Sequence, residues 1–154
     1  MNKICCFAGH SKIYHTDDIY DNLVNLIEKL IVDENVSEFW VGNYGSFDAL
    51  SGKAVRTLKE KYPDIQLNLI IPYLTSAINE YREQYYRNYD HIVVPDLPEK
   101  TPKRYQILKC NEYMVNNSDF IICYVQNSCG GAFKTMEYAQ KKKHIKIFNL
   151  FSNC

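Results

Sequence analysis

The sequence predicts an α/β fold, a doubly wound and mainly parallel sheet with helices on both faces. Six short apolar segments are spaced along the chain, and segments with helical periodicity lie between them. The length of 154 residues is that of one domain with one hydrophobic core. Because no repeat, linker or low-complexity stretch divides the chain, we expect residues 1–154 to form a single domain.

The six apolar segments are rich in β-branched and aromatic residues and mostly do not alternate with polar ones. Strands that are buried on both faces have this composition. The segments are 3–9 (KICCFAG), 38–42 (EFWVG), 67–73 (LNLIIPY), 91–95 (HIVVP), 119–125 (DFIICYV) and 145–150 (IKIFNL). We expect six strands here.

Helical periodicity is clearest in three of the intervening stretches. The first begins at the candidate caps Thr16 and Asp17, the second ends before Pro63, and the third begins after Pro102. A tyrosine-rich stretch, residues 75–90, has no clear pattern, and we expect an irregular helix or a lid beside the sheet.

Charge and residue spacing narrow the choice of function. The 18 basic and 18 acidic residues cancel, so nucleic acid is not expected as a partner. The absence of a long apolar run and of a signal peptide predicts a cytoplasmic protein with no membrane partner. Scattered histidines and six cysteines without Cys-x-x-Cys spacing predict reduced thiols and no metal. No cofactor is expected, since both the dinucleotide fingerprint and the phosphate-loop motif are missing.

Small residues follow three of the predicted strands, in the loops AGHSK (8–12), VGNYGSFD (41–48) and QNSCGGAFKT (126–135). The carboxyl ends of parallel strands meet at one edge of a sheet, so these loops are predicted to surround one crevice. The candidate ligand-binding residues in and just after these loops are Gly9, His10, Ser11, Asn43, Gly45, Ser46, Asp48, Ser128, Gly130, Gly131, Thr135 and Glu137.

Each candidate also has a structural interpretation. Gly130 and Gly131 would let backbone N–H groups approach a phosphate at a helix start, or they would only form a tight turn. Asp48 would accept hydrogen bonds from a ribose or a base edge, or it would stabilise the first turn of a helix. Cys129 precedes the glycine pair, and a nucleophilic role has no nearby histidine to support it.

Four segments together resemble the SLOG superfamily: CCFAGHSKI, VGNYGSFDALSGKAVRTLKEKYPDIQLNLIIPYL, NEYMVNNSDFIICYV and SCGGAFKTMEYAQKKKHIKIFNL. That superfamily includes the SMF/DprA DNA-processing proteins, the "lonely guy" phosphoribohydrolases and a branch of small bacterial and prophage proteins. The similarity is greatest to this small branch. The resemblance implies a Rossmann-like fold that binds nucleotides or ADP-ribose-type signals, and it adds Asn111 to the predicted site.

The sequence also departs from the pattern of the family. Ser11 and Cys110 stand where the small branch usually has arginine, which weakens any strong phosphate clamp. Three residues separate Gly131 from Thr135, whereas glycine and threonine lie closer together in the PGGxGTxxE motif of the hydrolases. In addition, no proline precedes the glycine pair of this chain.

These observations leave three functional hypotheses. The leading one is a binding protein for a nucleotide or ADP-ribose-derived molecule, acting as a signal sensor or as a phage-type sponge in anti-phage defence. The alternative is a nucleoside monophosphate phosphoribohydrolase in which Glu137 would assist the attack. The third is an interaction protein whose residues 75–90 form an oligomer interface, and a homo-oligomer is expected in any case.

Overall fold

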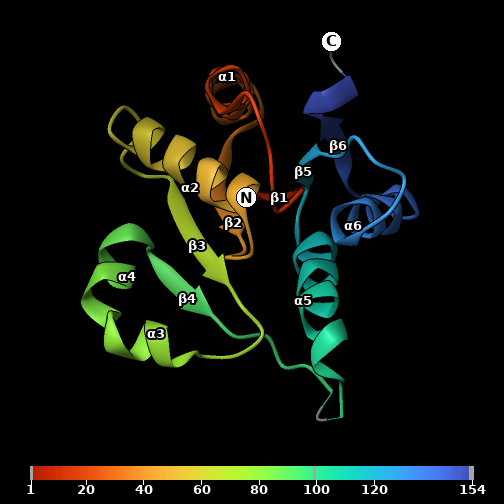
Figure 1. The fold of residues 1–154 in the computed structure, drawn as a ribbon. Coiled ribbons are helices and arrows are strands. Elements are labelled where there is room, and N and C mark those ends of the chain that lie inside the picture. The colour runs from red at the N-terminus through yellow and green to blue at the C-terminus, as the bar shows by residue number, and fades with distance from the viewer. Residues whose placement is uncertain (1, 99, 153–154) are drawn as a thin grey trace.

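The computed structural model describes residues 2–98 and 100–152, and a six-stranded sheet lies at its centre (Figure 1). All strand pairs are parallel, in the order β4-β3-β2-β1-β5-β6, which confirms the predicted fold class. The strands are β1 (Lys3–Gly9), β2 (Val36–Val41), β3 (Gln66–Ile70), β4 (His91–Val93), β5 (Phe120–Tyr124) and β6 (Lys146–Asn149).

Helices cover both faces of the sheet, with α1 and α2 on one side and α5 and α6 on the other (Figure 1). The helices are α1 (Thr16–Glu34), α2 (Ser46–Lys59), α3 (Ser76–Glu80), α4 (Arg82–Asn88), α5 (Lys103–Asn117) and α6 (Gly131–Gln140), and a 3₁₀ helix, η1 (Leu150–Ser152), follows β6. Within the described residues, no helix combines the length and the apolar character that crossing a bilayer requires.

Strand β1 shows why the apolar segments do not alternate. Successive side chains point to opposite faces, so Cys5 and Phe7 join the core under α1 and α2, whereas Cys6 and Ala8 join the core under α5 and α6. All four side chains are buried. A continuous apolar run is therefore what a strand between two helical layers needs.

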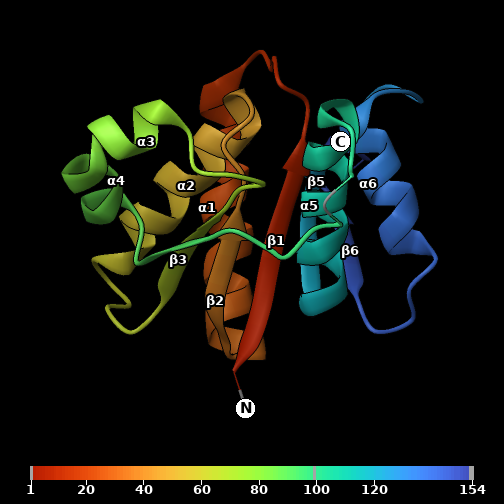
Figure 2. The same cartoon turned by 90° about the horizontal axis from the view of Figure 1, so that it is seen from below.

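The order of the strands creates a switch point between β1 and β5. After β1 the chain adds β2, β3 and β4 on one side, and the connection to α5 then crosses the sheet so that β5 and β6 follow on the other side (Figure 2). The loops after β1 and β5 leave the sheet in different directions. In doubly wound sheets, ligands bind at this position.

One local expectation changes in the structure. The start of α1 was predicted at caps Thr16 and Asp17, which is wrong: the cap is His15, in the left-handed region at φ 55°, and its carbonyl accepts from the N–H of Ile19 at 3.3 Å. Asp17 instead lies in the first turn, where a negative charge is favourable.

The tyrosine-rich stretch forms the two short helices α3 and α4. Tyr85 and Tyr89 stack with their ring centroids 6.3 Å apart and pack against a small core around Ile78. Tyr81 and Tyr86 are exposed by about half. An oligomer interface on this surface remains a prediction.

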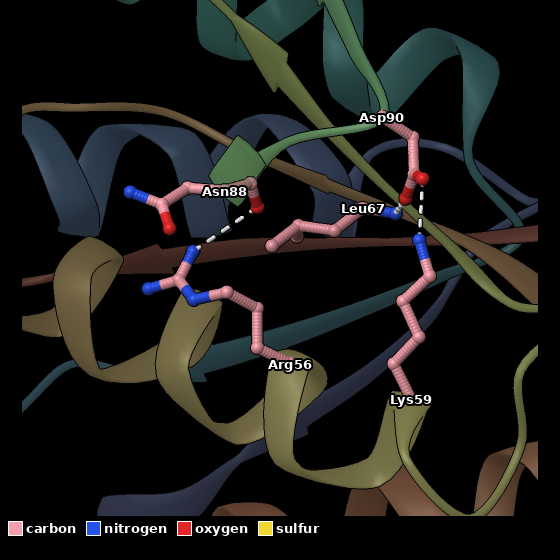
Figure 3. A network of polar contacts seen from close by, with 5 residues as sticks. All are labelled: Arg56, Lys59, Leu67, Asn88 and Asp90. Carbon is pink, nitrogen blue, oxygen red and sulfur yellow. Dashed lines mark hydrogen bonds and ion pairs between the residues drawn. The ribbon is translucent and has the colours of Figure 1, made fainter. Parts of the chain in front are cut away.

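Asp90 joins the edge strand β4 to the rest of the sheet (Figure 3). Its N–H donates to the carbonyl of Leu67 at 2.8 Å, and its Oδ2 accepts from the N–H of Leu67, also at 2.8 Å. Its other oxygen pairs with Lys59 of α2, and the nearby Arg56 donates to the Asn88 carbonyl at 3.4 Å. These contacts hold β4 and α4 against α2.

Candidate functional site

A cavity of about 610 Å³ opens beyond the carboxyl ends of β1 and β5, at the switch point of the sheet. We call it the switch-point cavity. It is lined by Phe7, Ala8, Gly9, His10, Ser11, Lys12, Tyr14, Tyr44, Asp48, Ile107, Asn111, Gln126, Asn127, Cys129, Gly130, Gly131 and Ala132. Residues from all three predicted loops and from α5 therefore line the same cavity.

Hydrogen bonds join the three loops to one another. His10 accepts from the Gln126 N–H at its Nε2 atom, at 2.9 Å, which connects the loops after β1 and β5. The N–H of Ser46 donates to the carbonyl of Ser11 at 2.8 Å, which connects the loop after β1 to the start of α2. The cavity is thus held by contacts between segments far apart in the sequence.

Two predicted glycines serve the packing of these loops. A Cβ atom on Gly9 would lie 2.3 Å from the ring of Phe47, and one on Gly45 would lie 2.4 Å from Cα of Ser11. Both distances are shorter than real contacts allow. Gly45 does not line the cavity, so its contribution is to let the second loop approach the first.

Asp48 lines the cavity from the first turn of α2. Its Oδ2 accepts from the N–H of Tyr44 at 3.0 Å, and none of the ion pairs found among residues 2–98 and 100–152 involves it. Burial raises the pKa of the Asp48 carboxyl to about 6, although the bond from Tyr44 opposes that shift. The carboxyl of Asp48 therefore lines the cavity without an ion-pair partner among the described residues.

The glycine pair lies at the start of α6. Gly130 has φ 93°, and Cβ atoms built on Gly130 or Gly131 would meet no atom within 4 Å. No side chain caps α6, although the Lys134 N–H donates to the Gly130 carbonyl at 3.1 Å. The first N–H groups of a helix carry partial positive charge, so this end of the cavity suits an anion.

Thr135 and Asn111 form a pair between α5 and α6. The Thr135 hydroxyl donates to the Gly131 carbonyl at 2.9 Å and accepts from Nδ2 of Asn111 at 3.2 Å. Asn111 lines the cavity, whereas Thr135 is buried and does not. Thr135 was predicted as a ligand-binding residue, but its hydroxyl forms hydrogen bonds within the protein.

The structure brings seven of the predicted residues to the cavity and leaves six outside its lining. The seven are Gly9, His10, Ser11, Asp48, Asn111, Gly130 and Gly131. The others are Asn43, Gly45, Ser46, Ser128, Thr135 and Glu137, among which Asn43, Ser46, Ser128 and Glu137 have exposed side chains.

Sequence reasoning missed Lys12 and the tyrosines Tyr14 and Tyr44. Lys12 directly follows Ser11, so a cation is present one residue beyond the position where the resemblance to the small branch implies arginine. The signal was present in the AGHSK loop. Burial raises the pKa of the Tyr44 phenol above its usual range, which keeps the phenol neutral and able to donate.

The cysteines divide by location. Cys5, Cys6, Cys110 and Cys123 are free and buried, whereas Cys129 is exposed at the edge of the cavity. Cys154 lies outside the described residues. Desolvation raises the pKa of the Cys6 thiol to about 12, which makes it inert at neutral pH.

The fold and the cavity define a Rossmann-like α/β protein with a cavity at the switch point of its sheet. A family model described as the YspA SLOG family matches residues 7–151, and the chain belongs to this family. A search of curated proteins gave no match.

Two solved structures of DNA processing protein A have a similar fold. The protein from Streptococcus pneumoniae gives a TM-score of 0.68 at 15% identity, over 97% of this chain and 50% of that one. The protein from Helicobacter pylori, described for its single-stranded DNA binding mode, gives 0.65 at 14% identity, over 94% of this chain and 64% of that one. The chain thus spans half of the first protein and under two thirds of the second.

One expectation about partners must be corrected. The balanced net charge led us to expect no nucleic acid, yet a protein with a similar fold binds single-stranded DNA. The expectation was wrong because net charge averages over the whole surface, whereas phosphate contacts depend on local donors. A cavity with Lys12 and the start of α6 provides such donors regardless of the total charge.

Proposed function

We propose that the protein binds a nucleotide or an ADP-ribose-derived small molecule in the switch-point cavity, as a signal sensor or a phage-type sponge. The observation that carries this proposal is that one cavity contains groups suited to each part of a nucleotide. Its lining includes the start of α6 and Lys12, which offer N–H groups and a cation, and it also includes the carboxyl of Asp48 and the tyrosines Tyr14 and Tyr44.

A phosphate group fits the start of α6. The uncapped N-terminus of α6 offers backbone N–H groups, and the absence of side chains on Gly130 and Gly131 permits close approach. Lys12 adds a full positive charge to the lining. This combination supports a single phosphate or a diphosphate and takes the place of the missing arginines.

A ribose and a base fit other groups of the same lining. Asp48 has one oxygen that Tyr44 does not occupy, and a carboxylate accepts the hydroxyl hydrogens of a ribose well. Acidic residues after the second strand bind ribose hydroxyls in many dinucleotide-binding folds. Tyr14 and Tyr44 provide flat surfaces on which a base could stack.

The position of Glu137 makes the phosphoribohydrolase alternative less favoured. That mechanism relied on Glu137, whose side chain is exposed and outside the cavity lining. A general acid or base must reach the bond that breaks. We therefore propose capture of the ligand rather than its cleavage.

Single-stranded DNA is a second candidate ligand, because DNA processing protein A from Helicobacter pylori binds it and the present fold is similar. A DNA strand carries the same phosphate and base groups in a repeating form. Its sugar lacks the 2′-hydroxyl, however, and most of its 3′-oxygens are esterified, so Asp48 would lose its partners. We accordingly rank the free nucleotide above DNA.

Mass spectrometry and calorimetry can test the proposal. One sample of the purified protein is denatured, and any released nucleotide is identified. A second, folded sample that has been freed of ligand is titrated with AMP, ADP-ribose, cyclic ADP-ribose and a thymidine oligonucleotide. Lys12→Ala should weaken binding of the phosphate-bearing probe, whereas the control Lys29→Ala, an exposed lysine on α1, should not. Absence of any bound or titratable nucleotide would overturn the proposal, and preference for the oligonucleotide would favour DNA.

A further inference from the structure

Thr135 is almost completely buried, with 1% of its surface exposed, and both hydrogen bonds of its hydroxyl are defined. A hydroxyl has only one hydrogen to donate. That hydrogen goes to the Gly131 carbonyl, one turn earlier in α6, at 2.9 Å. The hydroxyl can therefore only accept from its remaining neighbour, Asn111.

This arrangement decides which way the side-chain amide of Asn111 faces. Because Thr135 needs a donor, Asn111 presents its NH₂ group to α6, with 3.2 Å between Nδ2 and Oγ1. Its Oδ1 then lies at the other end of the amide. In the part of the chain that the structure describes, Oδ1 accepts no side-chain hydrogen bond and is not buried, and Asn111 lines the cavity.

A second acceptor lines the same cavity. Asp48 lies in the first turn of α2, on the opposite face of the sheet from α5, and it belongs to the same lining as Asn111. Asp48 and Asn111 together offer oxygen acceptors to a molecule in the cavity.

We infer that Thr135 is a positioning residue that orients the Asn111 amide, and that the oxygen of Asn111 selects a ligand carrying a hydroxyl pair, such as an unmodified ribose, next to its phosphate. This inference rests on the proposed nucleotide-binding function and specifies its ligand class. A phosphate on the ribose would place an anion against two acceptors, and a deoxyribose would leave them unpaired.

Three variants separate positioning from packing. Thr135→Val keeps the shape of the side chain but removes both hydrogen bonds, whereas Thr135→Ser keeps the hydroxyl. Asn111→Ala removes the selecting group itself. Thr135→Val is expected to lower the melting temperature somewhat, since a buried hydroxyl bond is lost, so the readouts below compare ratios and signals within each folded variant.

The first readout needs no ligand. In NMR spectra the side-chain NH₂ of Asn111 should exchange slowly with solvent in the native protein and in Thr135→Ser, and quickly in Thr135→Val. Equal exchange in all three would overturn the positioning role, even if no ligand has been found.

The second readout is discrimination between AMP and 2′,3′-dideoxy-AMP. The native protein and Thr135→Ser should prefer AMP by about tenfold or more, as expected for an unpaired polar group. Thr135→Val and Asn111→Ala should reduce that ratio several-fold while still binding both, and the preference that remains is due to Asp48. An unchanged ratio in Thr135→Val would overturn the inference but leave nucleotide binding intact. Failure of the native protein to bind any of the nucleotide probes would overturn the proposed function, and the ligand selection with it.

Discussion

The imidazole of His10 accepts a hydrogen bond of 2.9 Å from the backbone N–H of Gln126, and this bond joins two loops that line the switch-point cavity. His10 follows β1 and Gln126 follows β5, so the bond spans the switch point of the sheet. A ring nitrogen that accepts must carry no hydrogen, which places the ring hydrogen on Nδ1. Protonation of Nε2 would break the connection.

Replacing His10 by phenylalanine should weaken nucleotide binding without unfolding the protein. Phenylalanine can keep the edge-on contact with Tyr124, whose ring centroid lies 6.5 Å from that of His10, but it cannot accept from Gln126. Because Gln126 is exposed, water can replace the lost bond, and we expect a stability change under about 1 kcal/mol. His10→Gln, which keeps an acceptor, is the matched control in calorimetric titrations. Equal affinity of His10→Phe and the native protein would show that the connection has no role in binding.

Asp48→Asn should stabilise the protein at neutral pH. Burial raises the pKa of the folded Asp48 carboxyl to about 6, so folding favours the protonated form, and the stability it contributes below pH 4 is lost as pH rises through 6. Asparagine keeps an acceptor for the Tyr44 N–H and avoids burying a charge. The gain should be about 1–3 kcal/mol at pH 7.5 and near zero at pH 3.5.

Urea unfolding at the two pH values measures this difference. The control is Asp21→Asn, an exposed carboxylate on α1, which should change the stability by less than about 0.5 kcal/mol. Asp48→Asn should also bind AMP less tightly, because the negative charge toward the ribose is lost. A loss of stability in Asp48→Asn at neutral pH would show instead that the charge of Asp48 stabilises the first turn of α2.

Asp90→Asn should destabilise the protein at neutral pH, in contrast to Asp48→Asn. Burial acts to raise the pKa of Asp90, but the hydrogen bonds from Lys59 and from the Leu67 N–H outweigh it and hold the pKa below its ordinary value. The stability that Asp90 contributes is therefore present above pH 4 and is lost as the pH falls. At pH 7 the variant should be less stable by about 1 kcal/mol, because the pair with Lys59 loses its charge.

The two aspartates make a matched comparison in one protein. Denaturant curves at pH 7 should move in opposite directions for Asp48→Asn and Asp90→Asn, and both should converge on the native protein in acid. Parallel shifts would contradict the assigned environments. Lys59→Met should reproduce most of the loss in Asp90→Asn if the ion pair is its source.

Glu137→Ala should change neither binding nor any cleavage of AMP. The side chain is exposed and is not part of the cavity lining, so its removal takes nothing from the ligand. Incubation of the native protein with AMP should release adenine at a rate far below the order of 1 per second that is common for enzymes. Rapid adenine release that disappears in Glu137→Ala would establish the hydrolase instead.

The fold was predictable because its signals are local. Runs such as residues 119–125 are apolar on both faces of a strand, and the structure buries Ile121 and Ile122 on opposite sides. The loops after β1, β2 and β5 were predictable for the same reason, since small residues follow each strand. Which side chains in them reach the cavity depends on long-range contacts, and those were not predictable.

Gly45 and Lys12 illustrate that limit. Gly45 has the appearance of a ligand-binding glycine in the sequence, but the structure places it against the backbone of Ser11, a contact that no local pattern specifies. Lys12 was not predicted because the resemblance to the small branch implies a cation one residue earlier, where this chain has Ser11. The Asn111–Thr135 hydrogen bond joins residues 24 positions apart and could not be derived from spacing.

Gly131→Ala is the sharpest test of the glycine pair. Among the described glycines, positive φ angles occur at Gly45 and Gly130 but not at Gly131, which begins α6. An alanine at Gly130 would be strained at φ 93° by about 1–2 kcal/mol, so lost binding there could reflect a disturbed turn. Alanine at Gly131 meets no protein atom within 4 Å and favours a helix, so stability should stay equal or rise by up to about 1 kcal/mol.

Binding in the same Gly131→Ala variant should nevertheless be abolished. The added methyl group would lie in the cavity lining, where it would keep a phosphate from the N–H groups of α6. Gly52→Ala is the matched control: it is a helical glycine of α2 outside the cavity, and its new Cβ would lie 3.3 Å from the flexible end of Arg56. Thermal melts and AMP titrations of both variants separate the effects. If Gly131→Ala binds as the native protein does, the glycine pair only forms a turn, and the phosphate must be held elsewhere in the cavity.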